Sequence, residues 1–334
     1  MVFSENSEDL IIRWIFAETV RYKNRNRSII YPKAWLWASH TRIQKILFSV
    51  FEEFDIPITR SWYMWGGFVH SDTLGEKFNY YRANFSKHPE RALNLRKKAI
   101  NLDLPIKEII NSVERHTDEV VSIPSKQFLP LFYKRETPEE FRNLYISKHN
   151  IADFLHRLKS FKPNQVTKIK NTINQTYDAI SDFHMSSLMF IDDMTYDDLN
   201  LRFAELIESS FDKLILLITE KEKISKLKLS FYSFAENVFN YYIWKPYACR
   251  ISQLTLKGIR LESEKEKMKY IEKTTIDDSH DKLDKLSNIK DTYGLSLSWE
   301  ELQKFKKIEF ENKENYKILS EVIGIYDRSQ QEGD

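Results

Sequence analysis

Glycine is so scarce in this chain that it constrains the fold more than any other feature. The 334 residues include only 7 glycines, at positions 66, 67, 75, 258, 294, 324 and 333. None therefore occurs between residues 76 and 257. Glycine supplies the positive-φ positions of tight hairpins and the close backbone approaches of phosphate-binding loops. Its absence argues against a P-loop, a dinucleotide-binding turn or a many-stranded sandwich in that stretch. We therefore expect long helices and a mainly α-helical fold.

Composition excludes several classes of protein. Hydrophobic residues make up 42% of the chain and aromatic residues 14%, which is too much for a disordered protein. The single cysteine, Cys249, excludes an internal disulfide and a cysteine-rich zinc site. The first ten residues lack the basic residues of a signal peptide, and no apolar run approaches the roughly 20 residues of a membrane span. We expect a cytoplasmic protein that has no cofactor and does not contact a membrane.

Apolar periodicity and Pro positions divide the chain into three parts. Residues 1–123 are expected to form a compact helical domain, and residues 124–262 an antiparallel bundle of long helices. Residues 263–334, rich in Lys, Glu and Asp at first, are expected to form a charged connector and a C-terminal helical pair. The predicted helices cover residues 7–22, 32–53, 74–83, 88–101, 105–122, 137–161, 164–190, 195–222, 225–262, 298–309 and 311–326.

Local signals mark some of these helix ends. Thr137 is predicted to cap a helix, with Pro138 in its first turn and Glu140 completing a capping box. Ser298 and Glu301 predict a second capping box. Pro246 is expected to kink or split the helix that contains it, because proline lacks the backbone N–H and its ring clashes with the preceding turn.

Residues 55–71 differ from the rest of the chain. The segment is aromatic and β-branched, and Gly66-Gly67 interrupts it. This pattern predicts a small β-hairpin or wing, giving the first domain a winged-helix-like corner.

Positive charge is concentrated near the N-terminus. Residues 1–100 hold 16 Lys and Arg against 10 Asp and Glu, and residues 19–51 contain no acidic residue at all. Tyr22, Tyr31, Trp35 and Trp37 are interleaved with the cations, and clustered cations with stacking aromatics suit a polyanion surface. An ordinary solvated loop beside a core helix is the alternative. The candidate nucleic-acid-binding residues are Arg21, Lys23, Arg25, Arg27, Lys33, Arg42 and Lys45.

Residues 43–74 resemble the N-terminal part of the Panacea-type (SocA-like) antitoxin domain. The shared pattern is a helix with an apolar stripe, an Ile-Pro-Ile-Thr turn at 56–59 and an aromatic-glycine element. Gly67 stands where that family usually has proline. The resemblance implies a small helical domain with a winged-helix-like corner and a role in toxin neutralisation, anti-phage defence or repression. The matching residues are Ile46, Leu47, Phe51, Trp62, Tyr63, Trp65, Gly66, Phe68 and Val69.

One candidate for metal binding lies on the helix predicted over 137–161. His149, Asp153 and His156 are spaced so that they share one helix face, where two imidazoles and a carboxylate could bind a divalent cation. A second helix would have to supply further ligands, such as Asp192, Asp193, Asp197 or Asp198. The alternative is a polar helix face with each His bonded to a local carboxylate.

The same helix offers a candidate catalytic pair, Arg142 and His149. Their spacing is similar to the signature of HEPN-type helical ribonucleases, in which His serves as general acid or base and Arg stabilises phosphate charge. An Arg paired to Glu139 or another carboxylate, with an unrelated His, is the alternative.

Cys249 is expected to be a buried apolar residue. The aromatic stretch 230–247 is expected to belong to the core rather than to form an exposed partner-binding face.

The leading functional hypothesis is a non-enzymatic regulatory or interaction protein. Its basic N-terminal surface would contact nucleic acid or a protein partner, with Trp62, Tyr63 and Trp65 as aromatic anchors. Alternatives are a ribonuclease using Arg142 and His149, and a structural subunit that assembles with copies of itself.

Overall fold

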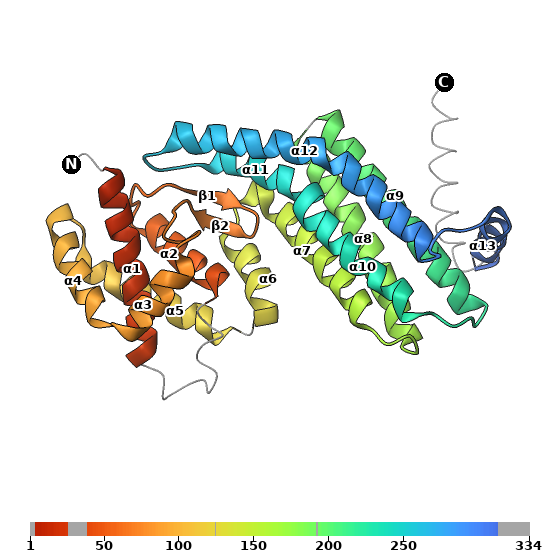
Figure 1. Cartoon of the computed structure of the whole chain (residues 1–334), viewed down its shortest axis with the longest axis horizontal. Helices are drawn as coiled ribbons and strands as arrows, with labels where there is room; N and C mark the ends of the chain where they lie inside the picture. The colour runs from red at the N-terminus through yellow and green to blue at the C-terminus, as the bar shows by residue number, and fades with distance from the viewer. Residues whose placement is uncertain (1–3, 26–38, 124, 192, 313–334) are drawn as a thin grey trace, which may run out of the picture.

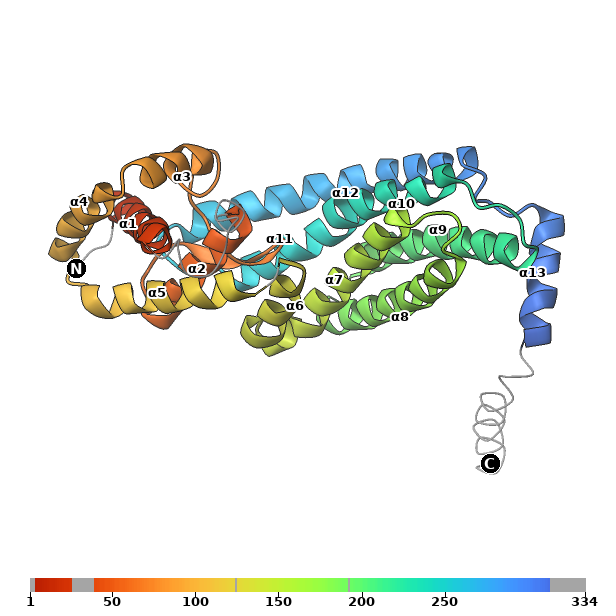
Figure 2. The ribbon, with the colours of Figure 1, turned by 90° about the horizontal axis from the view of Figure 1, so that it is seen from below.

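The chain folds into an elongated, mainly α-helical molecule with one small hairpin, as the sequence predicts (Figure 1). The computed structural model describes residues 4–25, 39–123, 125–191 and 193–312. One half contains α1 to α5 and the hairpin, and the other contains the long helices α7 to α12. Figure 2 shows the two halves side by side along the long axis.

The first half is built around α1, whose residues are buried on most sides. Helices α3, α4 and α5 all contact it, and Ile11, Trp14, Ile15 and Phe16 are fully enclosed. The helix start predicted at Pro32 lies outside the described residues; the described helix begins at His40, capped by the Ser39 hydroxyl. The elements are α1 (Glu5–Arg25), α2 (His40–Glu53), α3 (Phe78–Lys87), α4 (Glu90–Ala99), η1 (Ile100–Leu102) and α5 (Ile106–Ser122).

The predicted hairpin is present within residues 55–71. Strands β1 (Arg60–Tyr63) and β2 (Gly66–Val69) pair antiparallel, with Trp62 opposite Gly67. Glycine is required at position 67, because a Cβ there would lie 2.4 Å from the Phe48 ring on α2. The hairpin is thereby held close against α2.

The second half is an antiparallel bundle, and α6 connects it to the first. The connecting helix is α6 (Ser125–Glu136). The elements of the bundle are α7 (Glu139–Ser160), α8 (Val166–Phe190), α9 (Met194–Thr219), α10 (Lys226–Val238), the π-helical turn η2 (Phe239–Ile243), α11 (Trp244–Thr255) and α12 (Leu261–Thr292). Helices α7 and α8 share the most extensive contact in the molecule.

The predicted capping box at Thr137 is wrong. Helix α7 begins at Glu139 with Pro138 as its N-cap residue, and no side chain caps it. In the described structure the Thr137 hydroxyl is buried and has no hydrogen-bond partner. The backbone carbonyl of Thr137 accepts a hydrogen bond from the Arg142 guanidinium at 3.1 Å. Burial of the α6–α7 junction decides the geometry here, and the local sequence signal does not.

Pro246 interrupts its regular α-helix as expected, and a π-helical turn ends at Ile243, three residues before it. In a regular helix the Tyr242 carbonyl would accept from the N–H of residue 246, which proline lacks. The Ser279 hydroxyl from a neighbouring helix lies 2.8 Å from that carbonyl and takes the place of the missing donor.

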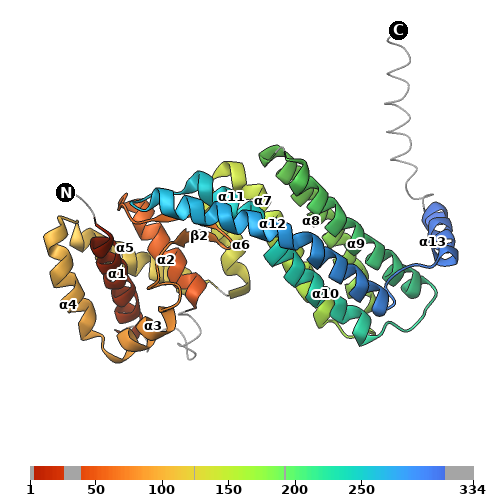
Figure 3. The same ribbon diagram turned by 45° about the horizontal axis from the view of Figure 1, so that its top comes forward.

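Residues 263–292 are not a connector, contrary to the prediction. They belong to α12 (Leu261–Thr292), the longest helix described, which packs along α11, α10 and α9 (Figure 3). Its buried stripe is narrow and partly polar, so hydropathy alone does not reveal it. The buried residues in the helix are Glu264, Met268, Thr275, Ser279, Leu283 and Leu286.

Helix α13 (Trp299–Asn312) confirms the second capping box. The Ser298 N–H donates to the Glu301 carboxylate at 2.9 Å, and the Glu301 N–H donates to the Ser298 hydroxyl at 3.2 Å. The helix predicted over 311–326 lies almost entirely outside the described residues.

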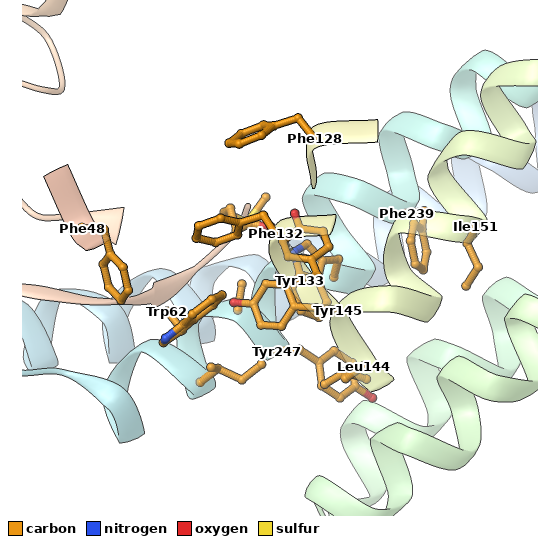
Figure 4. Packing of buried hydrophobic residues seen from close by; sticks show 14 of the residues in the cluster. Phe48, Trp62, Phe128, Phe132, Tyr133, Leu144, Tyr145, Ile151, Phe239 and Tyr247 are labelled. Carbon is orange, nitrogen blue, oxygen red and sulfur yellow. Dashed lines mark hydrogen bonds between the residues drawn. The ribbon is translucent and has the colours of Figure 1, made fainter. Parts of the chain in front are cut away.

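The hairpin joins the two halves. The Trp244 indole donates to the Met64 carbonyl at 2.8 Å, and the Tyr145 hydroxyl donates to the Tyr63 carbonyl at 2.8 Å. Trp62 lies in the aromatic cluster between the halves, with Phe132 and Tyr145 beside it (Figure 4). The core therefore runs continuously from one half to the other.

Candidate nucleic-acid interface

The cations predicted near the first helix do not form one exposed group. Arg21 donates to the Glu18 carboxylate at 2.9 Å, and Lys23 is buried. Arg25 is exposed at the end of α1. Arg27 and Lys33 lie outside the described residues.

Arg42 and Lys45 lie inside the molecule, so the predicted surface does not include them. Arg42 donates to the Ile123 carbonyl at 2.9 Å, and Lys45 donates to the Gly67 carbonyl at 2.7 Å. Both sit on the face of α2 that packs against the rest of the first half. Burial lowers the pKa of the Lys45 amine well below its usual value.

Trp62, Tyr63 and Trp65, the predicted aromatic anchors, lie at the joint between the halves rather than on a projecting wing. Trp62 is buried, and the other two are half-buried. The Trp65 ring covers the amine of Lys148, with 3.4 Å between Nζ and the ring centre. These residues hold the halves together.

A stronger cationic surface lies on helices α3 and α4. Between residues 77 and 98 the chain has seven cations and one carboxylate, that of Glu90. This α3–α4 surface consists of Lys77, Arg82, Lys87, Arg91, Arg96, Lys97 and Lys98.

Several of these side chains are free to meet a ligand. Lys87, Arg91, Lys97 and Lys98 are exposed. Within the described part of the chain, no carboxylate lies within ion-pair distance of Lys87, Lys97 or Lys98.

Two arginines of this surface hold helix α4 in place against its neighbours. Arg91 donates to the Asn84 side chain and so connects α4 to α3. Arg96 donates to the Glu18 carboxylate, which ties α4 to α1. Tyr80, 64% exposed on α3, adds an aromatic ring near the cations. The charge imbalance of 77–98 is also visible in the sequence, but the acid-free window 19–51 is the more conspicuous signal there.

A cavity of about 740 Å³ lies between the halves, with Phe48 and Trp62 among its lining residues. The positive and negative side chains that line this cavity pair with one another. Arg115 pairs with Glu53 at 2.6 Å, and Lys257 pairs with Glu52 at 3.1 Å. Because the cations there are paired with carboxylates, the cavity suits a polyanion less well than the α3–α4 surface.

The candidate catalytic pair is only partly available. The Arg142 guanidinium is engaged with the Thr137 carbonyl. The His149 ring packs edge-on against Tyr133, with 6.1 Å between ring centres. Burial, and then the positive charge of Lys148, lowers the pKa of His149. Neither residue lines the cavity between the halves. The ribonuclease hypothesis remains an untested prediction.

The candidate metal ligands do not converge. Asp153 pairs with Arg157, and His156 lies 3.5 Å from Glu236. Among the residues that the structure describes, no three His, Cys, Asp or Glu side chains are arranged to hold a metal ion. Cys249 is fully buried, as expected, which raises the pKa of its thiol to about 12.

One family profile matches this chain. The profile, described as "Domain of unknown function (DUF8098)", matches residues 7–97 and 106–307 and so covers both halves. No curated protein and no solved structure matches the chain. In the described ranges, no helix combines the length and apolar character needed to cross a membrane.

Proposed function

The chain belongs to the DUF8098 family, and from the charge of α3 and α4 we propose that it is a non-enzymatic interaction protein that binds nucleic acid through the α3–α4 surface. The observation that carries the proposal is the ratio of seven cations to one carboxylate between residues 77 and 98. A surface of this kind attracts phosphates and releases their counterions on binding.

Residue types on this surface suit contact with the nucleic-acid backbone. Lys87, Lys97 and Lys98 would act as point charges for phosphates, and Arg91 can form bidentate contacts with them. Tyr80 offers a ring on which an unpaired base could stack. We expect affinity that depends strongly on salt and little on base sequence, because phosphate contacts carry no sequence information.

The regulatory role implied by the resemblance of residues 43–74 to antitoxin domains stays a prediction. Those residues span α2, the hairpin and the turn that follows it, which lie at the joint between the halves. A regulatory protein of this design would bind nucleic acid at one end and keep the rest of its surface for protein partners.

The test is a fourfold substitution of the exposed cations by alanine, Lys87→Ala, Arg91→Ala, Lys97→Ala and Lys98→Ala. Binding to a labelled DNA duplex, an RNA duplex and a single strand is measured by fluorescence anisotropy across a salt series. We expect affinity to fall at least about tenfold and the slope of log K against log salt to become shallower by about 3.

A matched control removes four exposed lysines elsewhere, at positions 134, 168, 170 and 223. This variant has the same net charge and should keep most of the affinity. Equal losses in both variants, or an unchanged salt slope in the first, would contradict the proposal.

A further inference from the structure

Helices α8 and α9 display two parallel ridges of exposed apolar and acidic side chains. On each helix the four residues follow the i, i+4, i+7, i+11 pattern that puts them on one face. The apolar members are strongly exposed: Met189 is 88% exposed and Met194 is 90% exposed. The ridge on α8 is Asp178, Asp182, Met185 and Met189, and the ridge on α9 is Met194, Asp198, Leu201 and Glu205.

A cavity of about 250 Å³ lies between helices α8 and α9. Ser181 and His184 of α8 and Leu201 and Glu205 of α9 are among its lining residues. Buried apolar side chains also line it, namely Ile151, Ile180, Phe183, Phe203 and Phe239. We call the two ridges and this cavity the α8–α9 groove.

One polar group of the groove has an unused acceptor. Asn200 lines the cavity and is only 5% exposed. Its amide nitrogen donates to the Ser187 hydroxyl at 3.0 Å and to the Tyr247 hydroxyl at 2.6 Å, which uses both N–H bonds. Its carbonyl oxygen has no hydrogen-bond partner in the described structure.

The charge of the groove defines the chemistry of its occupant. Between residues 178 and 212 the chain has nine carboxylates and a single cation, Arg202. Arg202 is itself paired with Asp284. Methionine-rich apolar surfaces adapt readily to a bound helix. A groove that is both apolar and acidic therefore fits a basic amphipathic helix.

The chain itself carries such a helix. On α4 and η1, Leu93, Lys97 and Ile100 follow one another at i, i+4 and i+7 and so share one face, while Arg91 and Lys98 are exposed on another side of the helix. Leu93 is 39% exposed and Ile100 is 56% exposed, so the described part of the chain leaves this face open to solvent.

We propose that α4 of one copy binds in the α8–α9 groove of a second copy. An apolar side chain of α4 enters the cavity, and its cations pair with the acidic residues of the ridges. Because α4 lies at the far end of one half and the groove lies in the other (Figures 1 and 3), each copy keeps one free helix and one free groove. The contact is heterologous and repeats head to tail.

This contact uses cations that the proposed function assigns to phosphates, so nucleic acid and the groove would compete for α4. The inference does not require that nucleic acid binds, because the carboxylates alone supply the complementary charge.

Two charge-reversal variants test the contact. Lys97→Glu with Lys98→Glu disables α4 and leaves the groove intact. Asp182→Lys with Asp198→Lys disables the groove and leaves α4 intact. All four side chains are exposed, so the fold should tolerate the changes, and circular dichroism checks this.

Sedimentation velocity at low ionic strength reads out the assembly. We expect the wild type to associate with increasing concentration and each variant alone to stay monomeric. An equimolar mixture of the two variants should associate again, because opposite charges then face each other between the two proteins. Association should weaken as salt approaches about 0.15 M. A monomeric wild type, a monomeric mixture, or variants that associate like the wild type would overturn the proposal.

A third variant tests the cavity without changing charge. Ala204 lines the cavity, and Ala204→Phe fills it, which should weaken self-association by about tenfold.

The groove variants should bind nucleic acid at least as well as the wild type, since their α3–α4 surface is unaltered. Loss of nucleic-acid binding in the fourfold alanine variant and loss of assembly in the groove variant are therefore separate results. Unchanged assembly in Ala204→Phe would count against insertion into the cavity.

Discussion

At the scale of single residues, the buried amine of Lys148 is an unusual group among those that the structure describes. The side chain is fully buried, its Nζ has no hydrogen-bond partner in the described structure, and Trp65 covers it. Burial, and then the positive charge of Lys45, lowers the pKa of Lys148 well below its usual value, while Glu236 acts weakly in the opposite direction. Between this lowered pKa and about pH 10, the folded protein therefore lacks a proton that the unfolded chain still carries.

That difference makes stability depend on pH. Where the unfolded chain binds more protons than the folded protein, the free energy of unfolding rises with pH. For Lys148 this range extends from its lowered folded pKa up to the unfolded value near 10. The cost of burying the amine is thus present at neutral pH and disappears above about pH 10.

Replacing Lys148 by methionine should remove this cost. We expect Lys148→Met to raise the free energy of unfolding at pH 7 by about 1–3 kcal/mol. Between pH 7 and pH 10, the free energy of unfolding should increase less steeply with pH in the variant than in the wild type. Urea unfolding at several pH values measures both effects. Lys45→Met is the comparison, because it leaves the Gly67 carbonyl without its donor and should destabilise the fold. A Lys148→Met protein that unfolds in less urea than the wild type would disprove this account.

At the scale of elements, the interruption between α10 and α11 shows how one helix supplies what another lacks. Pro246 has no N–H for the Tyr242 carbonyl, and the backbone between α10 and α11 widens into a π-helical turn. The Ser279 hydroxyl lies within hydrogen-bond distance of both the Tyr242 carbonyl, at 2.8 Å, and the Thr275 carbonyl of its own helix, at 2.6 Å. Helix α12 is therefore bound to the π-helical turn η2 by a polar contact, in addition to its packing along α11 and α10.

A double-mutant cycle tests this compensation. Ser279→Ala should destabilise the fold by about 1–3 kcal/mol, because it leaves a buried carbonyl unpaired. In a Pro246→Ala background the backbone N–H of residue 246 becomes available, and the same substitution should cost clearly less. Chemical denaturation of the four proteins gives the coupling energy. Equal costs in the two backgrounds would mean that Ser279 does not replace the missing donor.

At the scale of the whole molecule, the two halves share one continuous core. Besides the hairpin contacts, Arg60 and Lys257 form an isolated β-bridge, and Arg260 pairs with Glu8 at 2.8 Å. Gly258 lies between these contacts at φ +117°, where a Cβ would be 2.4 Å from the Thr59 backbone. The segment between α11 and α12 can thus approach the first half only because residue 258 has no side chain.

Gly258→Ala should therefore disturb the joint between the halves. We expect the free energy of unfolding to fall by more than about 2 kcal/mol, since both the backbone conformation and the contact are lost. Fluorescence and calorimetry should then show less cooperative unfolding than in the wild type.

Gly294→Ala is the control, because Gly294 also has positive φ but only the flexible end of Lys228 lies near it. It should cost about 1 kcal/mol and leave a single transition. If both variants behave alike, the joint does not depend on the close approach at Gly258.

Much of the architecture could be predicted from sequence because it depends on local patterns. Scarcity of glycine and helical periodicity predict the helices, Gly66-Gly67 marks the hairpin, and Ser298 with Glu301 marks the start of α13. The candidate interface could be predicted only in part. The charge of residues 77–98 is visible in the sequence, but Arg42 and Lys45 have the same charge and are enclosed.

Local sequence is enough to set the conformation of most segments, since backbone preference depends on neighbours within a few residues. Tertiary structure alone decided which face of each helix is buried. It turned the charged stretch 263–292 into a packed helix, enclosed Lys45 and Lys148, and left the cations of α4 and the methionines of α8 and α9 exposed. Burial depends on contacts between residues far apart in the chain, such as Trp244 with Met64 and Ser279 with Tyr242, and no local pattern contains that information.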